Sequence, residues 1–371
     1  MKRRPFVRWF FCLLAVLAWA PAPASAGGGA ENVLLVVNRR SWASISVANH
    51  YIRLRNLPSR NVVYLDWPGV PSRTDIETFR RQILRPILTF IETNELDDHI
   101  DYVVYSSDFP WLIDGQGDTQ AVKLPYYLLP QGSLTGMTYL WPLVWAHRPD
   151  WIALDSNHYV RPAEPAPGVP GTHAFRSWYG WSEKGALLEA GGEHYMLSTA
   201  LAVTSGRGNS VNEAIEYLAR SAGADGSQPK GTIYFDETSD IRSTCRQPLF
   251  APAIEELKQL DVHGEIAREA LPRGRSDVQG VMAGVADFSW PKSLSTIRPG
   301  AICEHLTSAG GLLSQGEPQT PLTEWLRYGA AGSSGAVAEP YLIQAKFPLP
   351  QMHVHYARGS SLAEAYYQAV A

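Results

Sequence analysis

Two hydrophobic periods alternate along the N-terminal part of the chain. Residues 32–38 (NVLLVVN) form an unbroken apolar run, which is typical of a strand buried on both faces, and residues 62–67 and 101–108 predict two more strands. Between these strands, apolar residues recur at helical spacing in two segments, and Pro86 is expected to kink the second helix. This β-α-β-α-β order predicts parallel strands joined by right-handed crossovers.

The same alternation resumes towards the C-terminus. Apolar runs predict further strands over residues 196–204, 231–235, 278–286, 301–306 and 336–338. Helical spacing and capping residues predict helices over residues 210–223, 253–260, 320–329 and 361–370. We therefore predict an α/β fold in which a mostly parallel sheet carries helices on both faces.

The segment between these two parts has a different composition. Residues 109–193 hold six of the ten tryptophans that follow residue 26, many prolines and no sustained period. Linkers are poor in tryptophan, so we predict an ordered, aromatic-rich insertion between an N-terminal βαβαβ segment (27–108) and a C-terminal α/β segment (194–371). Its tryptophans are expected to fill a core, although such rings also stack on sugars. The last helix has no cap and no following element, which indicates a truncated C-terminus.

The first 26 residues have the pattern of a secretory signal peptide. A basic start (Lys2, Arg3, Arg4) precedes an apolar run that is too short to span a bilayer, and Ala24-Ser25-Ala26 is a small-residue cleavage pattern. We therefore predict export to the periplasm or beyond the cell.

Charge narrows the range of partners. Without residues 1–26, 28 basic residues stand against 36 acidic ones, a net charge of −8. Nucleic acids and anionic membranes both favour basic surfaces, so we expect neither as a partner once the signal peptide is removed. The expected partner is a ligand or substrate of unidentified chemistry.

Polar residues recur where the predicted strands end. Ligands of open parallel sheets bind beyond the carboxyl ends of the strands, so these residues are candidates for ligand binding, cation binding or acid–base chemistry. The strand-end residues are Asn38, Asp66, Asp108, Thr204, Ser205, Asp236, Glu237, Asp287, Thr307, Ser308 and Glu339. The predicted ligand-binding residues are Asp108, Thr204, Ser205, Arg207 and Glu339. The turn around Arg207 is interpreted as an ordinary strand-to-helix turn capped by Ser210, with anion binding by Arg207 as the alternative.

The densest local feature is the segment 300–311 (GAICEHLTSAGG), where a buried strand emerges into polar residues. A nucleophile and its base can be displayed at such a position. The candidate catalytic residues are Asp287, His305, Thr307 and Ser308. His305 is interpreted either as a general base or as a histidine hydrogen-bonded beneath the sheet.

The cysteines and histidines of the sequence do not identify a disulfide or a metal site. Cys245 and Cys303 are equally compatible with a disulfide and with buried free thiols. His353 and His355 share a face only if their segment is a strand, and no third ligand is evident, so no metal site is predicted. No cofactor is predicted either, because the sequence contains no G-x-S-x-G, H-E-x-x-H or phosphate-binding glycine motif.

Several C-terminal motifs carry a resemblance. PGAICEHLTSAGG, LTEWLRYGAAGSSGAVAEPY, KFPLPQMHVHYARG and SLAEAYYQAV resemble the pattern of an uncharacterised family of exported bacterial proteins. More distantly, the order of residues 306–310, 328–337 and 359–365 resembles caspase-like folds such as the gingipain and CHAT peptidases. That resemblance implies a caspase-like second half. The cysteine of the peptidases would fall on Ser308 or Ala309 here, and no His-Gly follows the strand that ends at Asp287.

Two functions remain open from the sequence. The first is a non-catalytic or divergent binding module built on a peptidase-like scaffold. The second is a hydrolase with an active site around Asp287, His305 and Ser308.

Overall fold

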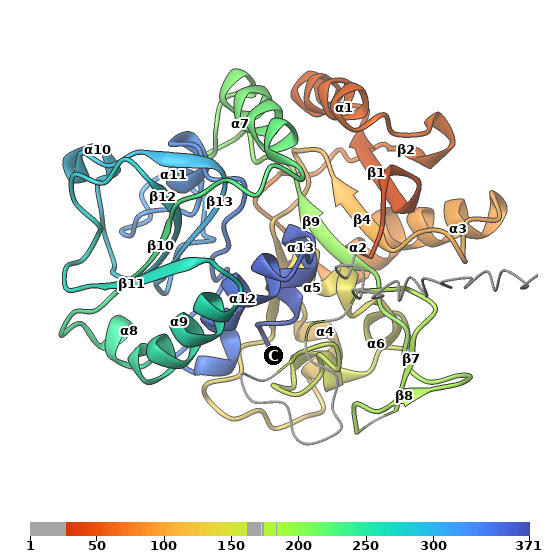
Figure 1. Ribbon diagram of the computed structural model, residues 1–371. Coiled ribbons are helices and arrows are strands. Elements are labelled where there is room, and N and C mark those ends of the chain that lie inside the picture. The colour runs from red at the N-terminus through yellow and green to blue at the C-terminus, as the bar shows by residue number, and fades with distance from the viewer. Residues whose placement is uncertain (1–26, 162–171, 173, 183) are drawn as a thin grey trace, which may run out of the picture.

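The computed structural model describes residues 27–161, 172, 174–182 and 184–371. The predicted signal peptide lies outside the described residues. The described chain is α/β, and its core strands form two separate parallel sheets (Figure 1).

The first sheet, sheet A, has the order β2-β1-β4-β9 and all its pairs are parallel. Its strands are β1 (Val33–Asn38), β2 (Val62–Leu65), β4 (Tyr102–Tyr105) and β9 (Leu197–Ala200). The last strand follows the aromatic insertion in sequence but pairs with β4 in register Tyr102 to Leu197. Sheet A is therefore completed by a strand nearly a hundred residues away from its neighbour.

The second sheet, sheet D, has the order β11-β10-β12-β13 and is also parallel throughout. Its strands are β10 (Thr232–Asp236), β11 (His263–Ala267), β12 (Val278–Gly284) and β13 (Ile297–Leu306). The sequence predicted one mostly parallel sheet, and the structure has two. Apolar runs identify buried strands but not their pairing partners, which explains the difference.

Two strand predictions in this part need correction. The edge strand β11 was not predicted, because in this strand only Ala267 is buried and no apolar run marks it. Residues 336–338 were predicted as a strand, but the structure forms none there. The neighbouring Gly332 makes a single bridge to Ile302 of β13 instead.

The main helices follow the strands. They are α1 (Trp42–Arg55), α2 (Ile76–Phe79), α3 (Arg85–Thr93), α7 (Val211–Ala224), α8 (Ile241–Thr244), α9 (Phe250–Gln259), α10 (Trp290–Ser293), α11 (Thr323–Arg327), α12 (Gln351–Ala357) and α13 (Leu362–Tyr367). The capping box predicted at Ser210 opens α7, where Glu213 donates its N–H to Ser210 Oγ at 3.2 Å. Short 3-10 turns lie at Ala30–Asn32, Ser59–Asn61, Pro149–Ile152, Gln247–Leu249 and Gln344–Lys346.

The helical segment that contains Pro86 is irregular just before the proline. A π-helical turn (Arg80–Leu84) joins α2 to α3, and the N–H of Arg85 bonds the carbonyl of Arg80. A proline ring clashes with the carbonyl four residues earlier and supplies no N–H, so a wider turn just before it relieves the conflict.

The insertion packs into the core around sheet A. Its strands β5 (Leu112–Asp114) and β6 (Gln131–Ser133) form a small sheet with β3 (Arg73–Asp75) of the N-terminal segment. Its strands β7 (Gly180–Trp181) and β8 (Leu187–Leu188) form a hairpin. Its helices are α4 (Gln116–Thr119), α5 (Leu134–Tyr139) and α6 (Trp141–Trp145). Trp151 and Trp181 are buried in the hydrophobic clusters, as expected for core residues, whereas Trp145 and Trp178 are exposed.

Alternate residues of β1 enter different hydrophobic clusters. Leu34 and Val36 belong to the cluster that contains Phe79 of α2, whereas Leu35 and Val37 belong to the cluster that contains Val47 of α1. The unbroken apolar run of this strand reflects burial on both faces.

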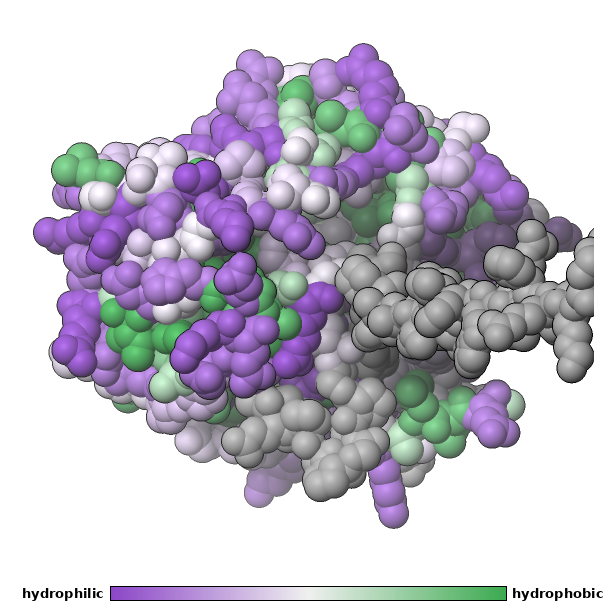
Figure 2. All heavy atoms as spheres, viewed as in Figure 1, coloured by the Kyte–Doolittle hydropathy of each residue, from purple (hydrophilic) through white to green (hydrophobic). Residues whose placement is uncertain are grey.

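The C-terminal helices lie between the two sheets (Figure 1). Helix α13 contacts β9 of sheet A, and α12 contacts both α13 and α9, which packs beside sheet D. Figure 2 shows apolar atoms at the surface near β11 and α9, where Ile266 of β11 is partly exposed.

Candidate functional site

Three residues at the carboxyl edge of sheet A donate hydrogen bonds to Asp108. Thr204 Oγ1 donates a hydrogen bond to Asp108 Oδ1 at 2.6 Å, and Ser41 Oγ donates to Asp108 Oδ2. Asn38 Nδ2 donates to the main-chain carbonyl of Asp108 at 3.0 Å. The sequence predicted that Asp108 and Thr204 belong to one site, and the structure brings them together.

The backbone of Asp108 is also unusual. Its φ of 58° lies in the left-handed region, which residues other than glycine visit rarely and in which aspartate is among the better tolerated. Strain of this kind persists where surrounding contacts fix the conformation, and it is common at functional sites. The bonds from Ser41, Thr204 and Asn38 are such contacts.

Sheet topology places Asp108 where ligands of parallel sheets bind. From β1 the chain moves to β2 on one side and then returns to β4 on the other, so β1 and β4 flank the switch point of sheet A. Asn38 ends β1 and Asp108 follows β4, and the crevice beyond this point is the expected ligand position.

A cavity of about 640 Å³ opens at this crevice, and we call it the edge cavity. Helix α1 begins on its rim and α7 begins nearby. Its lining includes Ser41, Trp42, Trp67, Asp108, Thr204 and Ser205.

A second cavity, of about 520 Å³, lies between the two sheets, and we call it the inter-sheet cavity. Its walls come from the ends of β4 and β9, from α5, α13 and residues 333–340, and from β13. Most of the lining is aromatic or aliphatic, and its charged members are Asp108, Glu304, Glu339 and Lys346. Asp108 thus lines both cavities.

A buried ion pair between Glu304 and Arg246 lies at the sheet D side of the inter-sheet cavity. Arg246 Nη1 contacts Glu304 Oε2 at 2.5 Å, with both side chains almost completely buried. Arg246 Nη2 also donates to the carbonyl of Ala283. Burial raises the pKa of Glu304, and the charge of Arg246 opposes that rise. Sequence reasoning missed this pair, because the two residues are 58 positions apart.

His305 is buried and fully hydrogen-bonded. Trp325 Nε1 donates to its Nδ1 at 3.0 Å, and its Nε2 lies 3.0 Å from the carbonyl of Thr320. Burial lowers the pKa of His305 to about 4, so the ring is neutral near pH 7. Of the two interpretations left open, this geometry matches the histidine held beneath the sheet.

The other candidates near His305 each have a different partner. Thr320 Oγ1 contacts the exposed Asp287 at 3.5 Å, Thr307 Oγ1 donates to Gln319 Oε1 at 2.5 Å, and Ser308 Oγ donates to Glu339 Oε1 at 3.3 Å. None of the hydrogen bonds among the described residues joins Asp287, Thr307 or Ser308 to the imidazole of His305. The geometry therefore does not assemble the nucleophile and base that were expected here.

The turn that holds Ser205 and Arg207 is tied to the neighbouring loop. Arg207 donates its backbone N–H to the carbonyl of Leu313 at 2.7 Å and its guanidinium to the carbonyl of Glu317 at 2.9 Å. At Gly206, whose φ is 60°, an added Cβ would lie 2.0 Å from the Leu313 carbonyl oxygen. These contacts fit the interpretation as a structural strand-to-helix turn.

Cys245 and Cys303 are free thiols, so of the two alternatives the structure has no disulfide between them. His353 and His355 lie on helix α12, where residues two apart diverge. Asp236 is buried at the end of β10, and burial raises its pKa well above the usual range.

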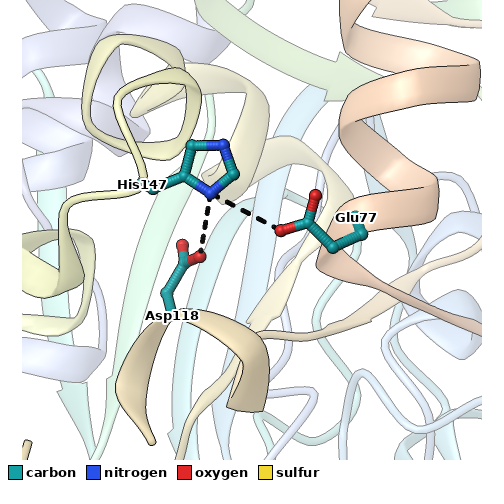
Figure 3. A group of neighbouring side chains, drawn as sticks. All are labelled: Glu77, Asp118 and His147. Atoms are coloured by element: carbon teal, nitrogen blue, oxygen red, sulfur yellow. Dashed lines mark ion pairs between the residues drawn. The ribbon is translucent and has the colours of Figure 1, made fainter. Parts of the chain in front are cut away.

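A cluster that the sequence did not suggest joins α2, α4 and the loop after α6. His147 Nδ1 lies 3.5 Å from Glu77 Oε1 and 3.7 Å from Asp118 Oδ1 (Figure 3). The ligand atoms of these residues lie within 4.8 Å of one another, as a metal site requires. However, the buried guanidinium of Arg80 contacts both carboxylates and already supplies a positive charge. The cluster is explained as an ion-pair network around Arg80.

The protonation state of His305 can be tested by NMR. We expect imidazole NMR to show one tautomer, protonated at Nε2, with no titration between pH 5 and 8, because Trp325 donates to Nδ1 and Thr320 accepts from Nε2. The unfolded chain takes up the proton near 6.5, so stability contributed by His305 is lost as pH falls from about 6.5 towards 4. A titration midpoint near 6.5 in the folded protein would contradict this assignment.

None of the helices in the described part of the chain combines the length and apolar character needed to cross a membrane. Compared with known proteins, the chain matches no family model, no curated protein and no solved structure.

Proposed function

We propose that this protein is an exported binding module that holds a small, largely apolar molecule in the inter-sheet cavity. The observation that carries the proposal is the cavity itself, which measures about 520 Å³ and is lined mainly by aromatic and aliphatic side chains with a few polar groups. Ligand sites in proteins have this size and composition, and they often lie between structural units.

Unpartnered hydroxyl groups indicate that the ligand also forms hydrogen bonds. Ser107, Ser198 and Ser333 line the inter-sheet cavity, and the buried Oγ of each has no partner in the described structure. A buried hydroxyl without a partner costs about 1–3 kcal/mol. Polar groups of a ligand, or water held with it, remove that cost.

Charge at the cavity favours a neutral or cationic ligand. Glu304 is paired with Arg246. Burial lowers the pKa of Lys346, and the nearby charge of Glu339 opposes that change. The carboxylate of Asp108, in contrast, is held by the neutral hydroxyls of Ser41 and Thr204. An anionic ligand would therefore meet an excess of negative charge.

We further propose that the scaffold of this binding module derives from a caspase-like peptidase. The parallel strands of sheet D, with α11 and α13 following β13 in the chain, support it. Hydrolysis at Asp287, His305 and Ser308 is not proposed, because the hydrogen bonds of these residues lead to other partners.

A dye-binding experiment tests the proposal. N-phenyl-1-naphthylamine, which is uncharged at neutral pH and fluoresces in apolar surroundings, is expected to bind the mature protein with a saturable signal. Replacing Ser107 by leucine is expected to raise the dissociation constant at least tenfold, because the larger side chain fills part of the cavity. The sulfonated analogue 8-anilinonaphthalene-1-sulfonate is expected to bind more weakly, since it carries a negative charge.

Two variants serve as controls. Ser107→Ala removes the hydroxyl without filling the cavity, and Ser289→Leu makes the same chemical change as Ser107→Leu at an exposed position. Both are expected to bind the dye within threefold of wild type. Wild-type dye affinity in a folded Ser107→Leu variant would refute the proposed site, and tighter binding of the sulfonated dye would refute the charge preference.

A further inference from the structure

The edge cavity places a hydroxyl group against a carboxylate. Thr204 is only partly buried, lines the edge cavity, and donates its hydroxyl proton to Asp108 Oδ1 at 2.6 Å. A nucleophile within hydrogen-bond reach of a base, with the base oriented by a third group, is the arrangement that activates serine and threonine hydroxyls.

The base has such a third group. Ser41 Oγ donates to the other carboxylate oxygen, and Asn38 holds the Asp108 carbonyl, so both the side chain and the strained backbone of Asp108 are fixed. The remaining hydrogen bond of the carboxylate is the one to Thr204. Asp108 is therefore positioned to take the Thr204 proton and no side-chain rotation is needed first.

Backbone N–H groups that can stabilise a developing oxyanion belong to residues lining the same cavity. Trp42 and Ala43 begin the fourteen-residue helix α1 and line the edge cavity, and the first N–H groups of a helix have no intrahelical partner. Negative charge is stabilised at such a helix end.

The wall of the edge cavity also contains a buried N–H group without a partner among the described residues. Trp67 lines the edge cavity and is 96% buried, being 4% exposed, and its indole Nε1 has no partner in the described structure. A buried indole N–H normally has a hydrogen-bond acceptor. A carbonyl or hydroxyl oxygen of a bound substrate would supply one.

We propose that the edge cavity is an acyl-transfer site that hydrolyses esters, with Thr204 as the nucleophile and Asp108 as the general base. Thr204 Oγ1 attacks the ester carbonyl while its proton passes to Asp108. The tetrahedral intermediate collapses, the acyl–oxygen bond breaks, and Asp108 returns the proton to the departing alcohol. Water then attacks the acyl-threonine, Asp108 accepts its proton, and the carboxylic acid leaves as Thr204 recovers a proton.

Chemistry favours an ester over an amide. An activated alcohol leaves with little help from a proton, whereas an amine leaves only once it is protonated, and a carboxylate is too weak a base to retain a proton for it at neutral pH. The indoles of Trp42, which is 73% exposed at the rim, and Trp67 give the cavity aromatic surface. An aryl ester is therefore the substrate class that fits.

The test uses the mature chain with 4-nitrophenyl acetate and, separately, a fluorophosphonate that labels activated hydroxyl groups. Wild type is expected to hydrolyse the ester and to carry the label on Thr204, identified by peptide mass spectrometry. Thr204→Val and Asp108→Asn are each expected to lower kcat/KM at least 100-fold, whereas Thr204→Ser retains activity within tenfold. Thr244→Val, an exposed threonine on α8, is the matched control and stays at the wild-type value.

Each outcome decides the proposal. If Thr204→Val folds and hydrolyses the ester as fast as wild type, or if wild type is inactive and unlabelled at Thr204, the site is not catalytic. If Thr204→Val fails to fold, labelling of wild type decides, because a label on Thr204 requires an activated hydroxyl there. Dye binding in the inter-sheet cavity uses Ser107 and is measured separately, so the two proposals fail independently.

Discussion

Replacing Arg246 by methionine is expected to lower the free energy of unfolding by about 3–5 kcal/mol. Methionine leaves the carboxylate of Glu304 buried without its positive partner, and it also removes the donor to the Ala283 carbonyl. An uncompensated buried charge is far more costly than the pair is favourable. Urea-induced unfolding followed by circular dichroism measures the change.

A double variant separates the cost of leaving the Glu304 carboxylate buried without a partner from the cost of lost packing. Arg246→Met combined with Glu304→Met removes both charges and is expected to recover at least half of the lost stability, since apolar replacements of buried pairs are often near neutral. Arg242→Met, next to the pair in sequence but on a partly exposed ion pair with Asp240, is the control and is expected to change stability by less than about 1 kcal/mol. A loss of that small size in Arg246→Met itself would contradict the assignment.

The second large effect is expected at Trp325, whose replacement by alanine should cost about 3–5 kcal/mol. The indole is fully buried, stacks on Phe288 with ring centroids 4.4 Å apart, and lies edge-on to Trp290. Its Nε1 also donates to His305 Nδ1, so the alanine variant leaves both a cavity and an unpaired buried nitrogen. Thermal and urea unfolding measure the loss.

Trp178→Ala is the matched control for this prediction, because Trp178 is 52% exposed. It is expected to change stability by less than about 1 kcal/mol. If Trp325→Ala and Trp178→Ala cost the same, the cluster around Trp325 does not contribute to the core as described. A moderate effect of Trp325→Phe, which keeps an aromatic ring but not the donor, would show how much of the loss comes from the hydrogen bond.

The alternation of apolar runs was informative about strands and uninformative about sheets. It predicted β1, β10, β12 and β13 in the right places, since a strand buried on both faces needs apolar residues at consecutive positions. It missed β11, an edge strand with a single buried residue. It also could not show that β9 pairs with β4 across the insertion, because pairing is a contact between residues distant in sequence.

The residues of the candidate site were likewise only partly predictable from the sequence. The carboxyl-end rule correctly selected Asp108 and Thr204 as neighbours, because parallel strands of one sheet end at the same edge. The same rule grouped them with Asp287, Thr307 and Ser308, which follow strands of the other sheet. Ser41 was missed because it lies three residues beyond a strand end, as the N-cap of α1, and nothing in its local sequence signals contact with Asp108.

By itself, the sequence determined the α/β class, the positions of the buried strands, the capping box of α7 and the placement of polar residues at strand ends. These features depend on local periodicity and on backbone hydrogen bonding within a few residues. The tertiary structure alone decided the division into two sheets, the cavity between them, the burial that keeps His305 neutral and the pairing of Arg246 with Glu304. Each of these depends on which distant segments exclude water from one another, and such desolvation follows from the packed arrangement of the whole chain.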